Sequence, residues 1–446
     1  MIAQPPAGGA MFERGLKTHI IPTRTVRRVA APATRTVQAD VCVLGAGIAG
    51  VAAALEAAKL GRRVVLVDAA PALGGQAIGS IIGTLIGLYT HGPDPYQITH
   101  GIADELIRDL DAERSLVTYR RVTVTYQYDE LRLARWIERR VQAAGIQVLL
   151  GAVVTGAGFA ERRLGHVELA TRHGPVRISA QGFVDASGEA TLAWHAGLAL
   201  REPEEPIYGS LNFLIEGFDT HHLDELDMPA VHARLRERGA AYGLVRHDGH
   251  LMSFAARGFM LANIGHFETP LDPLAGAALV FEGRRQADAT LEFLRQEFPR
   301  IFAGARIRAY GNPGIRQTRW IVGRTQLTHA DILAGRRHAD AVARCAWWVE
   351  LHNTPEKVHW ERMPDNHVYT IPLGCMTPAE ADNIVAAGRC VDGDSHALSA
   401  IRVMGPCIAM GTAAAHALDL AGAGSVHMLD LAALQRRLYD NLERRD

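Results

Sequence analysis

The feature that most constrains the fold is a strand, a glycine-rich turn and a helix between Ala39 and Asp68. The segment ADVCVL ends at Leu44 and has the apolar run of a short buried strand, and the alanine-rich segment after it has the pattern of a helix that stops at Gly61. A second apolar run, RVVLVD, begins at Arg63 and predicts another strand. Two buried strands joined by one helix form a βαβ unit, which indicates a parallel sheet.

The turn inside this unit has the GxGxxG spacing of dinucleotide-binding sites, with Gly45, Gly47 and Gly50 at the glycine positions. The first glycine permits a tight turn, the second lets a pyrophosphate approach the backbone, and the third allows close helix packing. The N-terminus of the helix then offers amide donors to the phosphates. Asp68 ends the second strand, where a carboxylate accepts hydrogen bonds from an adenosine ribose. The spacing alone does not distinguish FAD from NAD.

A second glycine-rich segment directly behind Asp68 favours FAD. Gly74, Gly75 and Gln76 resemble the flavoprotein arrangement in which such a turn packs beside the pyrophosphate and the ribityl chain. The glycine-rich sequence continues to Gly87 and is too apolar for an exposed linker, so we expect it to lie against something bound.

The rest of the chain predicts two kinds of domain. A helical pattern followed by short strand patterns up to Val184 predicts a β-meander. A segment rich in tryptophan and histidine follows, and the C-terminal segment returns to a strand, a glycine turn and a helix. The predicted fold class is α/β: a Rossmann-like FAD-binding domain with a β-meander, discontinuous in sequence, plus an α+β substrate domain. The predicted parts are an N-terminal extension (1–37), the FAD-binding domain (38–200 and 370–446) and the substrate domain (201–369).

Two later motifs carry a family resemblance: VDASG, from Val184 to Gly188, and AAGRCVDGDSHALSAIRVMGPCIAMG near the C-terminal end. With the glycine segments, they resemble the FAD-dependent oxidoreductase family, which is related to the fumarate reductase and glutathione reductase flavoproteins. The resemblance covers almost the whole chain after residue 38. It implies that the DASG turn lies on the adenine side of FAD, that an acidic side chain of the GRCVDGD turn meets the ribityl hydroxyls, and that the last helix points its N-terminus at the flavin. Helix-end amides stabilise the negative charge of a reduced flavin. The predicted cofactor-binding residues are Gly45, Gly47, Gly50, Asp68, Gly74, Gly75, Gln76, Val153, Asp185, Gly188, Asp392, Asp394, Met404 and Gly405.

Three residues are predicted to be catalytic: His396, Arg402 and Arg316. His396 has a position similar to that of a substrate-contacting histidine in the succinate and fumarate branch of the superfamily, and a histidine titrates near working pH. Arg402 resembles that branch's substrate arginine, although its spacing departs from the pattern by two residues. Arg316 and Arg319, at positions i and i+3, are candidates to clamp a substrate carboxylate. The alternatives are a structural or solvated histidine and arginines that form interdomain salt bridges.

Composition limits the class of partner and the kind of site. The 446 residues should form roughly two or three domains. The 47 basic and 48 acidic residues nearly balance, so we expect a small-molecule substrate and neither nucleic acid nor membrane as partner. The five cysteines form no CxxC pair, which argues against a metal site or a dithiol centre and fits a reducing cytoplasm. Cys407 beside the last helix is either a thiol of lowered pKa or a packing residue. The sequence leaves open whether the protein is a homo-oligomer.

These features predict an FAD-dependent oxidoreductase that dehydrogenates a small polar amine, amino acid or hydroxyl compound by hydride transfer to flavin N5. Dioxygen or another acceptor then reoxidises the flavin. The middle of the chain contains no second GxGxxG for NAD(P)H. The alternatives are an NAD(P)H-dependent flavin monooxygenase, a thiazole-synthase-like protein for which Cys407 or Cys375 is essential, and a non-catalytic FAD-binding protein.

Overall fold

The computed structural model of the chain describes residues 24–27, 30–254 and 257–445. The chain has two parts, Met1–Ala33 and Thr34–Asp446. The described residues of the first part, 24–27 and 30–33, contain no helix or strand. The predicted N-terminal extension therefore lies mostly outside the described residues, and its last residues, 35–37, belong to the first strand of the second part.

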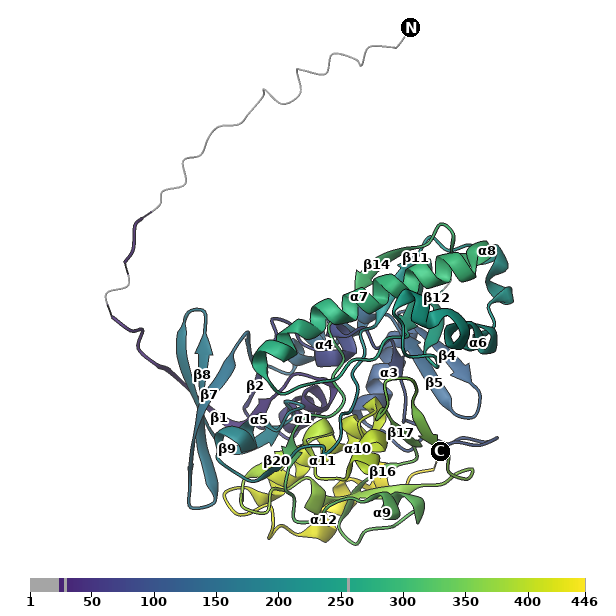
Figure 1. The fold of residues 1–446 in the computed structure, drawn as a ribbon. Coiled ribbons are helices and arrows are strands. Elements are labelled where there is room, and N and C mark those ends of the chain that lie inside the picture. The colour runs from purple at the N-terminus through teal and green to yellow at the C-terminus, as the bar shows by residue number, and fades with distance from the viewer. Residues whose placement is uncertain (1–23, 28–29, 255–256, 446) are drawn as a thin grey trace. The chain divides into compact units, whose positions relative to one another are not determined.

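A seven-stranded sheet forms the centre of the second part (Figure 1). Strand β1 (Arg35–Leu44) lies between β2 (Val64–Asp68) and β9 (Gly174–Asp185) and is parallel to both. β6 (Gln147–Leu150) pairs in parallel with β2, and β20 (Ile384–Ala386) pairs in parallel with β9. Strands from opposite ends of the sequence therefore share one sheet, and the predicted α/β class is confirmed.

The antiparallel side of the same sheet consists of β7 (Val153–Ala160) and β8 (Arg163–Thr171), which pair with each other and, through β8, with β9. This pairing also explains where β1 begins. We expected the first strand to start at Ala39, but β1 starts at Arg35 because its residues pair with β9 from Val176 onwards. The residues Arg35 to Gln38 are mostly exposed, so the strand begins before the apolar pattern that starts at Ala39.

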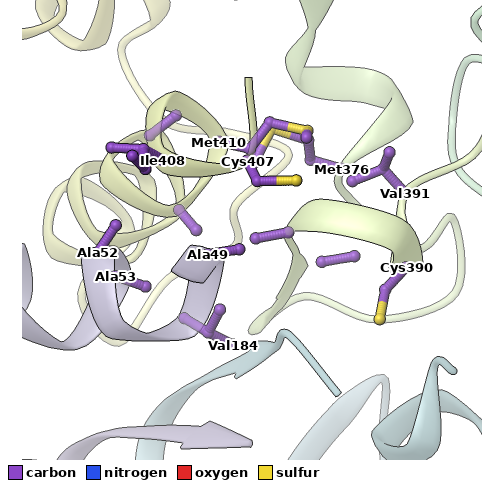
Figure 2. Close-up of a cluster of buried hydrophobic side chains, with 14 of the residues drawn as sticks. Ala49, Ala52, Ala53, Val184, Met376, Cys390, Val391, Cys407, Ile408 and Met410 are labelled. Carbon is purple, nitrogen blue, oxygen red and sulfur yellow. The ribbon is translucent and has the colours of Figure 1, made fainter. Parts of the chain in front are cut away.

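Helix α1 (Ile48–Lys59) packs directly against helix α11 (Met404–Ala421). A Cβ atom built at Gly411 would overlap the carbonyl oxygen of Ala49 and would lie 3.0 Å from Ala53 N. Figure 2 shows the alanines of α1 beside Ile408 of α11. The small side chains explain the alanine-rich sequence, because only they let two helix backbones approach so closely.

A second, antiparallel sheet has its own core. Its strand order is β12 (His250–Phe254), β13 (Phe259–Asn263), β11 (Phe213–Glu216) and β14 (Arg306–Tyr310). The long helix α7 (Pro273–Glu297) lies along this sheet (Figure 1). The buried residues of this core run from Leu211 to Ala305. The boundaries proposed above for the substrate domain, 201–369, stay a prediction.

The remaining elements belong to these cores or lie between them in the sequence. The other helices are α2 (Gly75–Gly79), α3 (Ile102–Ala112), α4 (Glu130–Ala143), α5 (Thr191–His195), α6 (Met228–Arg238), α8 (Pro299–Phe302), α9 (His329–Leu333), α10 (Ser395–Ile401), α12 (Leu431–Arg437) and α13 (Tyr439–Leu442). The other strands are β3 (Thr84–Leu85), β4 (Leu116–Arg120), β5 (Val124–Tyr128), β10 (Leu200–Arg201), β15 (Trp320–Ile321), β16 (Ala341–Cys345), β17 (Val349–Leu351), β18 (His359–Glu361) and β19 (Tyr369–Pro372). Among the described residues no single helix has the length and apolar character needed to cross a membrane, although α10 and α11 together meet those criteria across a bend of 91°.

The close contact of α1 and α11 predicts the effect of one methyl group. We expect Gly411→Ala to lower the free energy of unfolding by about 1–3 kcal/mol, because its Cβ would overlap the backbone of α1. Gly276→Ala is the matched control in α7, since its Cβ would have only an ordinary contact at 3.6 Å from Pro270 O. Denaturant titration of both variants measures the difference, and equal stability of the two would contradict the described packing.

Candidate active site

The turn between β1 and α1 leaves one glycine facing open space. Gly45 has a φ of +97°, and Gly50 lies so close to it that a Cβ at Gly50 would overlap the Gly45 carbonyl oxygen. The protein's own backbone therefore requires glycine at both positions, whether or not a ligand is bound. A Cβ at Gly47, by contrast, would meet no described atom within 4 Å.

The open space at Gly47 lies at the N-terminus of α1. Gly47 is the N-cap, and no side chain among the described residues caps this helix end, so the first-turn amides keep their hydrogen-bonding capacity. The half-buried Asp68 fixes the turn, since its carboxylate accepts from Ala46 N at 2.6 Å and from Ala70 N at 2.7 Å. Free amides, a helix dipole and an unfilled approach fit the pyrophosphate of a dinucleotide.

The second glycine segment packs against this turn. Gly74 and Gly75 have φ values of +102° and +52°, and a Cβ at Gly75 would lie 2.7 Å from Gly47 Cα. Gln76 Nε2 donates to Ile315 O at 3.0 Å. The structure therefore places Gly74 to Gln76 between the first glycine turn and the segment that contains Arg316.

The N-terminus of α11 lies against the end of the same glycine-rich segment. Gly405 N donates to Ile86 O at 3.0 Å, and a Cβ at Gly405 would overlap the Gly87 carbonyl oxygen. Met404 and Gly405 are buried, and no side chain of the described residues caps this helix. Burial raises the pKa of the Cys407 thiol to about 12, so this residue packs as a thiol and is not an activated thiolate.

Three carboxylates predicted to contact the cofactor are bonded to the chain's own donors. Asp185 and Asp392 are fully buried, and desolvation raises the pKa of both. Asp394 caps helix α10. The donors are Ser187 and Leu192 for Asp185, Arg201 and Gly323 for Asp392, and Ala397 and His329 for Asp394. In this structure these side chains hold the turns in shape, and their direct contact with the cofactor stays a prediction.

Two further predicted cofactor residues differ in their surroundings. Val153 begins β7 and is 55% exposed. Gly188 has a φ of +81°, and a Cβ at this position would overlap the guanidinium of Arg389. Gly188 therefore makes room for Arg389, whose Nη1 donates to Arg316 O at 3.4 Å.

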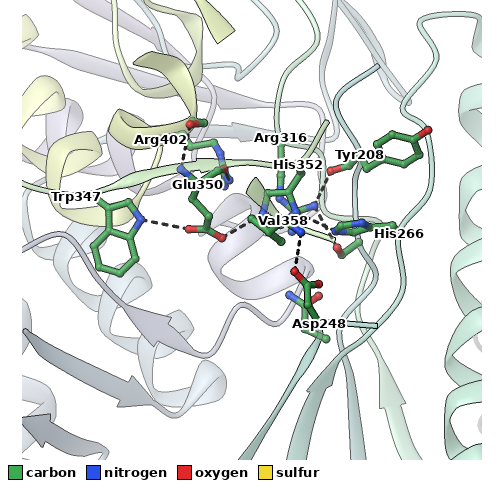
Figure 3. A network of polar contacts seen from close by, with 12 residues as sticks. Tyr208, Asp248, His266, Arg316, Trp347, Glu350, His352, Val358 and Arg402 are labelled. Carbon is green, nitrogen blue, oxygen red and sulfur yellow. Dashed lines mark hydrogen bonds and ion pairs between the residues drawn. The ribbon is translucent and has the colours of Figure 1, made fainter. Parts of the chain in front are cut away.

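Arg316 and Arg402 are half-buried guanidinium groups that lack a carboxylate partner (Figure 3). Arg316 Nη1 donates to Tyr208 O at 2.7 Å and to Ser210 Oγ at 3.1 Å. Arg402 Nη2 donates to Glu350 O at 3.1 Å, and its Nε has no partner among the described residues. Desolvation lowers the pKa of both groups. Within the described part of the chain, neither arginine forms an ion pair, so both retain capacity for an anion.

A third arginine adds to this positive charge. Arg246 is 4% exposed and pairs with Asp248 at 2.8 Å. Arg316 interacts electrostatically with Arg402, Arg246, Glu350 and Asp248, so three guanidinium groups face two carboxylates. The uncompensated positive charge favours an anionic group on a bound molecule.

Two buried histidines and Glu350 form a hydrogen-bonded series in the same network (Figure 3). Pro355 O can only accept, so His266 Nδ1 donates to it at 3.2 Å. His266 Nε2 then accepts from His352 Nδ1 at 2.9 Å. This arrangement leaves His352 Nε2 without a proton opposite Glu350 Oε1 at 3.1 Å, while Trp347 Nε1 donates to Glu350 Oε2 at 3.2 Å. With neutral imidazoles and a carboxylate, the series therefore has room for one additional proton.

The surroundings keep these imidazoles neutral. Desolvation is the largest cause that lowers the pKa of both His266 and His352, which are 7% and 2% exposed. Nearby arginines lower both pKa values further: Arg246 and Arg316 for His266, and Arg316, Arg402 and Arg246 for His352. Because both imidazoles are held neutral, His352 Nε2 and Glu350 Oε1 face each other at 3.1 Å as two acceptors with no proton between them.

The structure does not direct His396 into this network. Its ring stacks on His329 at 4.5 Å, and His329 Nε2 bonds Glu361 Oε2 at 2.5 Å. Desolvation, followed by His329, lowers the pKa of His396, and neither Arg316 nor Arg402 is among its electrostatic neighbours. The predicted catalytic residues thus fall into two groups, and the catalytic role of His396 stays a prediction.

The predicted carboxylate clamp of Arg316 and Arg319 stays a prediction. Arg319 lies over the ring of Trp194, with its guanidinium carbon 4.4 Å from the ring centroid. The segment around both arginines is not helical, so positions i and i+3 do not share a face.

Sequence reasoning also missed functional candidates, among them Arg246, Asp248 and His266. His266 and His352 are 86 residues apart in sequence and meet only in the fold. The one available signal was the concentration of histidines in the region assigned to the substrate domain.

Comparison with known proteins now identifies the family. Residues 40–438 match the family described as FAD dependent oxidoreductase. Because this match spans most of the chain, the protein belongs to that family: it is an FAD-dependent oxidoreductase, and FAD is its cofactor. No curated protein matches the sequence significantly.

Several solved structures are similar to this chain. A geranylgeranyl bacteriochlorophyll reductase-like protein from Thermoplasma acidophilum is 13% identical, with 92% of this chain and 85% of that chain covered and a TM-score of 0.48. An anhydrotetracycline hydroxylase from Streptomyces rimosus is 12% identical, with 92% and 66% covered and a TM-score of 0.46. A p-nitrophenol 4-monooxygenase from Pseudomonas putida DLL-E4 is 10% identical, with 92% and 85% covered and a TM-score of 0.44.

The different surroundings of the glycines predict two different defects. We expect Gly47→Ala to keep the stability of the apoprotein and to weaken FAD binding roughly tenfold or more, because its Cβ would enter the open space beside α1. Gly50→Ala should instead destabilise the apoprotein by about 1–3 kcal/mol, because its Cβ would overlap Gly45 O. Thermal unfolding and fluorescence titration with FAD separate the two effects. Unchanged FAD affinity in Gly47→Ala would contradict the assignment of this turn.

Proposed function

We propose that the protein dehydrogenates a small polar substrate that carries a carboxylate beside an amino or hydroxyl group. The proposed cofactor site is formed by the two glycine segments and the α11 N-terminus, in a Rossmann-like domain assembled from residues 38–200 and 370–446. The observation that carries the proposal is the hydrogen-bonded series of His266, His352 and Glu350, which has room for one proton. It lies beside two arginines that form no ion pair with the residues that the structure describes.

Arg316 and Arg402 are proposed to bind the substrate carboxylate. Both lie in a network with more guanidinium groups than carboxylates, and each keeps hydrogen-bonding capacity. A carboxylate bound by two guanidinium groups is held in one orientation, which a monodentate contact does not provide.

The histidine series is proposed to take the proton that dehydrogenation releases. Oxidation of an H–C–N–H or H–C–O–H unit removes a hydride from carbon and a proton from the heteroatom, and leaves a C=N or C=O bond. FAD supplies the hydride acceptor for this reaction when bound. The proton is accepted at His352 Nε2, where Glu350 Oε1 then receives a hydrogen bond. His266 holds the His352 ring through its Nδ1 atom.

The proposed reaction is tested with the FAD-loaded protein under anaerobic conditions. We expect amino acids or hydroxy acids to bleach the flavin, and the corresponding amines or alcohols without the carboxylate to do so poorly. Arg402→Gln should raise KM for the acids roughly tenfold or more, since a charge-assisted contact is lost. Arg336→Gln is the matched control, because Arg336 is exposed and pairs with Asp331 outside this network. Bleaching by NAD(P)H alone would favour a monooxygenase and contradict the proposal.

The proton acceptor is tested by a variant and by pH. His352→Gln should slow anaerobic flavin reduction about 10²- to 10⁴-fold, because an amide cannot accept the proton. Since desolvation lowers the pKa of His352 below its ordinary value of about 6.5, the base is protonated only at acidic pH. The wild-type rate should therefore stay constant through neutral pH and past pH 6.5, and should fall only at pH values well below 6.5.

The matched control for this variant is His232→Gln, which alters a histidine bonded to Gly249 O outside the series. It should leave the rate of flavin reduction and its pH profile unchanged. If His352→Gln and Glu350→Gln both reduced the flavin at the wild-type rate, the assigned proton acceptor would be wrong.

A further inference from the structure

We propose that a basic cavity beside the C-terminal helices binds a phosphorylated small molecule. The cavity has a volume of about 420 Å³. Most of its lining comes from β16, the segment before it, α13 and the residues that follow α13, and Tyr96, Thr370 of β19 and Gln435 of α12 complete it. The charged and aromatic residues that line it are Tyr96, Arg337, His338, Arg344, Glu443 and Arg445. None of these residues belongs to the glycine turns or to the network of Glu350, so the cavity is independent of the proposed reaction.

The charge of the lining favours an anion. Three guanidinium groups, from Arg337, Arg344 and Arg445, line the cavity with one carboxylate, Glu443. Within the described residues none of the three arginines has a carboxylate oxygen within 4.0 Å, whereas the neighbouring Arg336 and Arg444 each form an ion pair. An unneutralised set of like charges around one cavity is stabilised by a bound polyanion.

Arg344 is the buried member of this set. It is 2% exposed, and it donates from Nε to Asn441 O at 3.0 Å and from Nη2 to Asp440 O at 2.9 Å. These two carbonyl contacts fix the guanidinium plane and leave Nη1 without a hydrogen bond to the described residues. Desolvation is the largest cause that lowers the pKa of Arg344; repulsion from Arg337 and Arg445 lowers it further, while Tyr96 and Glu443 act in the opposite direction. A bound anion would offset both the desolvation of the Arg344 guanidinium and its repulsion by Arg337 and Arg445.

The size and composition of the cavity indicate the ligand class. Sites for small molecules have volumes of roughly 300–1,000 Å³, so this cavity accommodates a compact metabolite of about mononucleotide size. Planar guanidinium groups bind phosphate oxygens in pairs. Arg337 and Arg445 are exposed, which gives a ligand access, and the ring of Tyr96 lies under the Arg445 guanidinium at 6.0 Å.

The binding experiment uses the FAD-loaded full chain, so that added phosphates cannot occupy an empty flavin site. Isothermal titration calorimetry is performed with inorganic pyrophosphate, with AMP and with citrate. We expect saturable binding of pyrophosphate and AMP, with the flavin retained, and much weaker binding of citrate.

Variants of the two exposed arginines locate the site. Arg337→Gln and Arg445→Gln should each weaken pyrophosphate binding about tenfold, while Arg336→Gln should leave it unchanged. Arg336 is a matched control because it is adjacent in sequence and exposed, and it pairs with Asp331 at 2.8 Å. Since Arg344 also holds the backbone of α13, its variant is not used to locate the ligand.

Three results would overturn the proposal. The first is the absence of saturable binding of pyrophosphate and AMP to the wild-type holoenzyme. The second is equal weakening by Arg336→Gln and Arg337→Gln, which would show a nonspecific charge effect. The third is citrate binding as tightly as pyrophosphate, which would show that the cavity does not select phosphate. Failure of the dehydrogenation assay would leave all three readouts unaffected.

Discussion

The close contact between α1 and α11 is the constraint on which the rest of the structure depends. The two helices come from opposite ends of the sequence, and Gly411 lets their backbones meet at Ala49. The α11 N-terminus likewise has no room for a side chain at Gly405, because a Cβ there would overlap the carbonyl oxygen of Gly87. The glycine-rich segments are thereby held beside two helix N-termini that no described side chain caps, so the packing of small residues shapes the site proposed for the cofactor.

In the proposed reaction, the charged network links substrate binding to proton acceptance. Arg316 and Arg402 have no ion pair within the described residues, and their charges lower the pKa of His352. A carboxylate bound between the two arginines would neutralise part of that charge and raise the basicity of the imidazole. The base would then be strongest when a substrate is present, and the free protein would avoid burying an imidazolium.

The sequence predicted the parts of the fold that depend on neighbouring residues. The first strand, the glycine turn and helix α1 follow from local patterns, and the steric roles of Gly45 and Gly50 agree with their positions. It did not predict the network, because contacts such as His266 with His352 join distant segments. The clamping of a substrate carboxylate by Arg316 and Arg319 stays a prediction, because local sequence does not show that the Arg319 guanidinium lies over the distant Trp194 ring.

The five cysteines have a practical consequence. All five are free and buried, and they are distributed from Cys42 in β1 to Cys407 in α11. A thiol reagent can modify a buried cysteine only when the surrounding structure opens. The labelling rate of each cysteine therefore reports the local opening free energy at its own position. The native cysteines can thus serve as probes of local opening in the core that contains both β1 and α11.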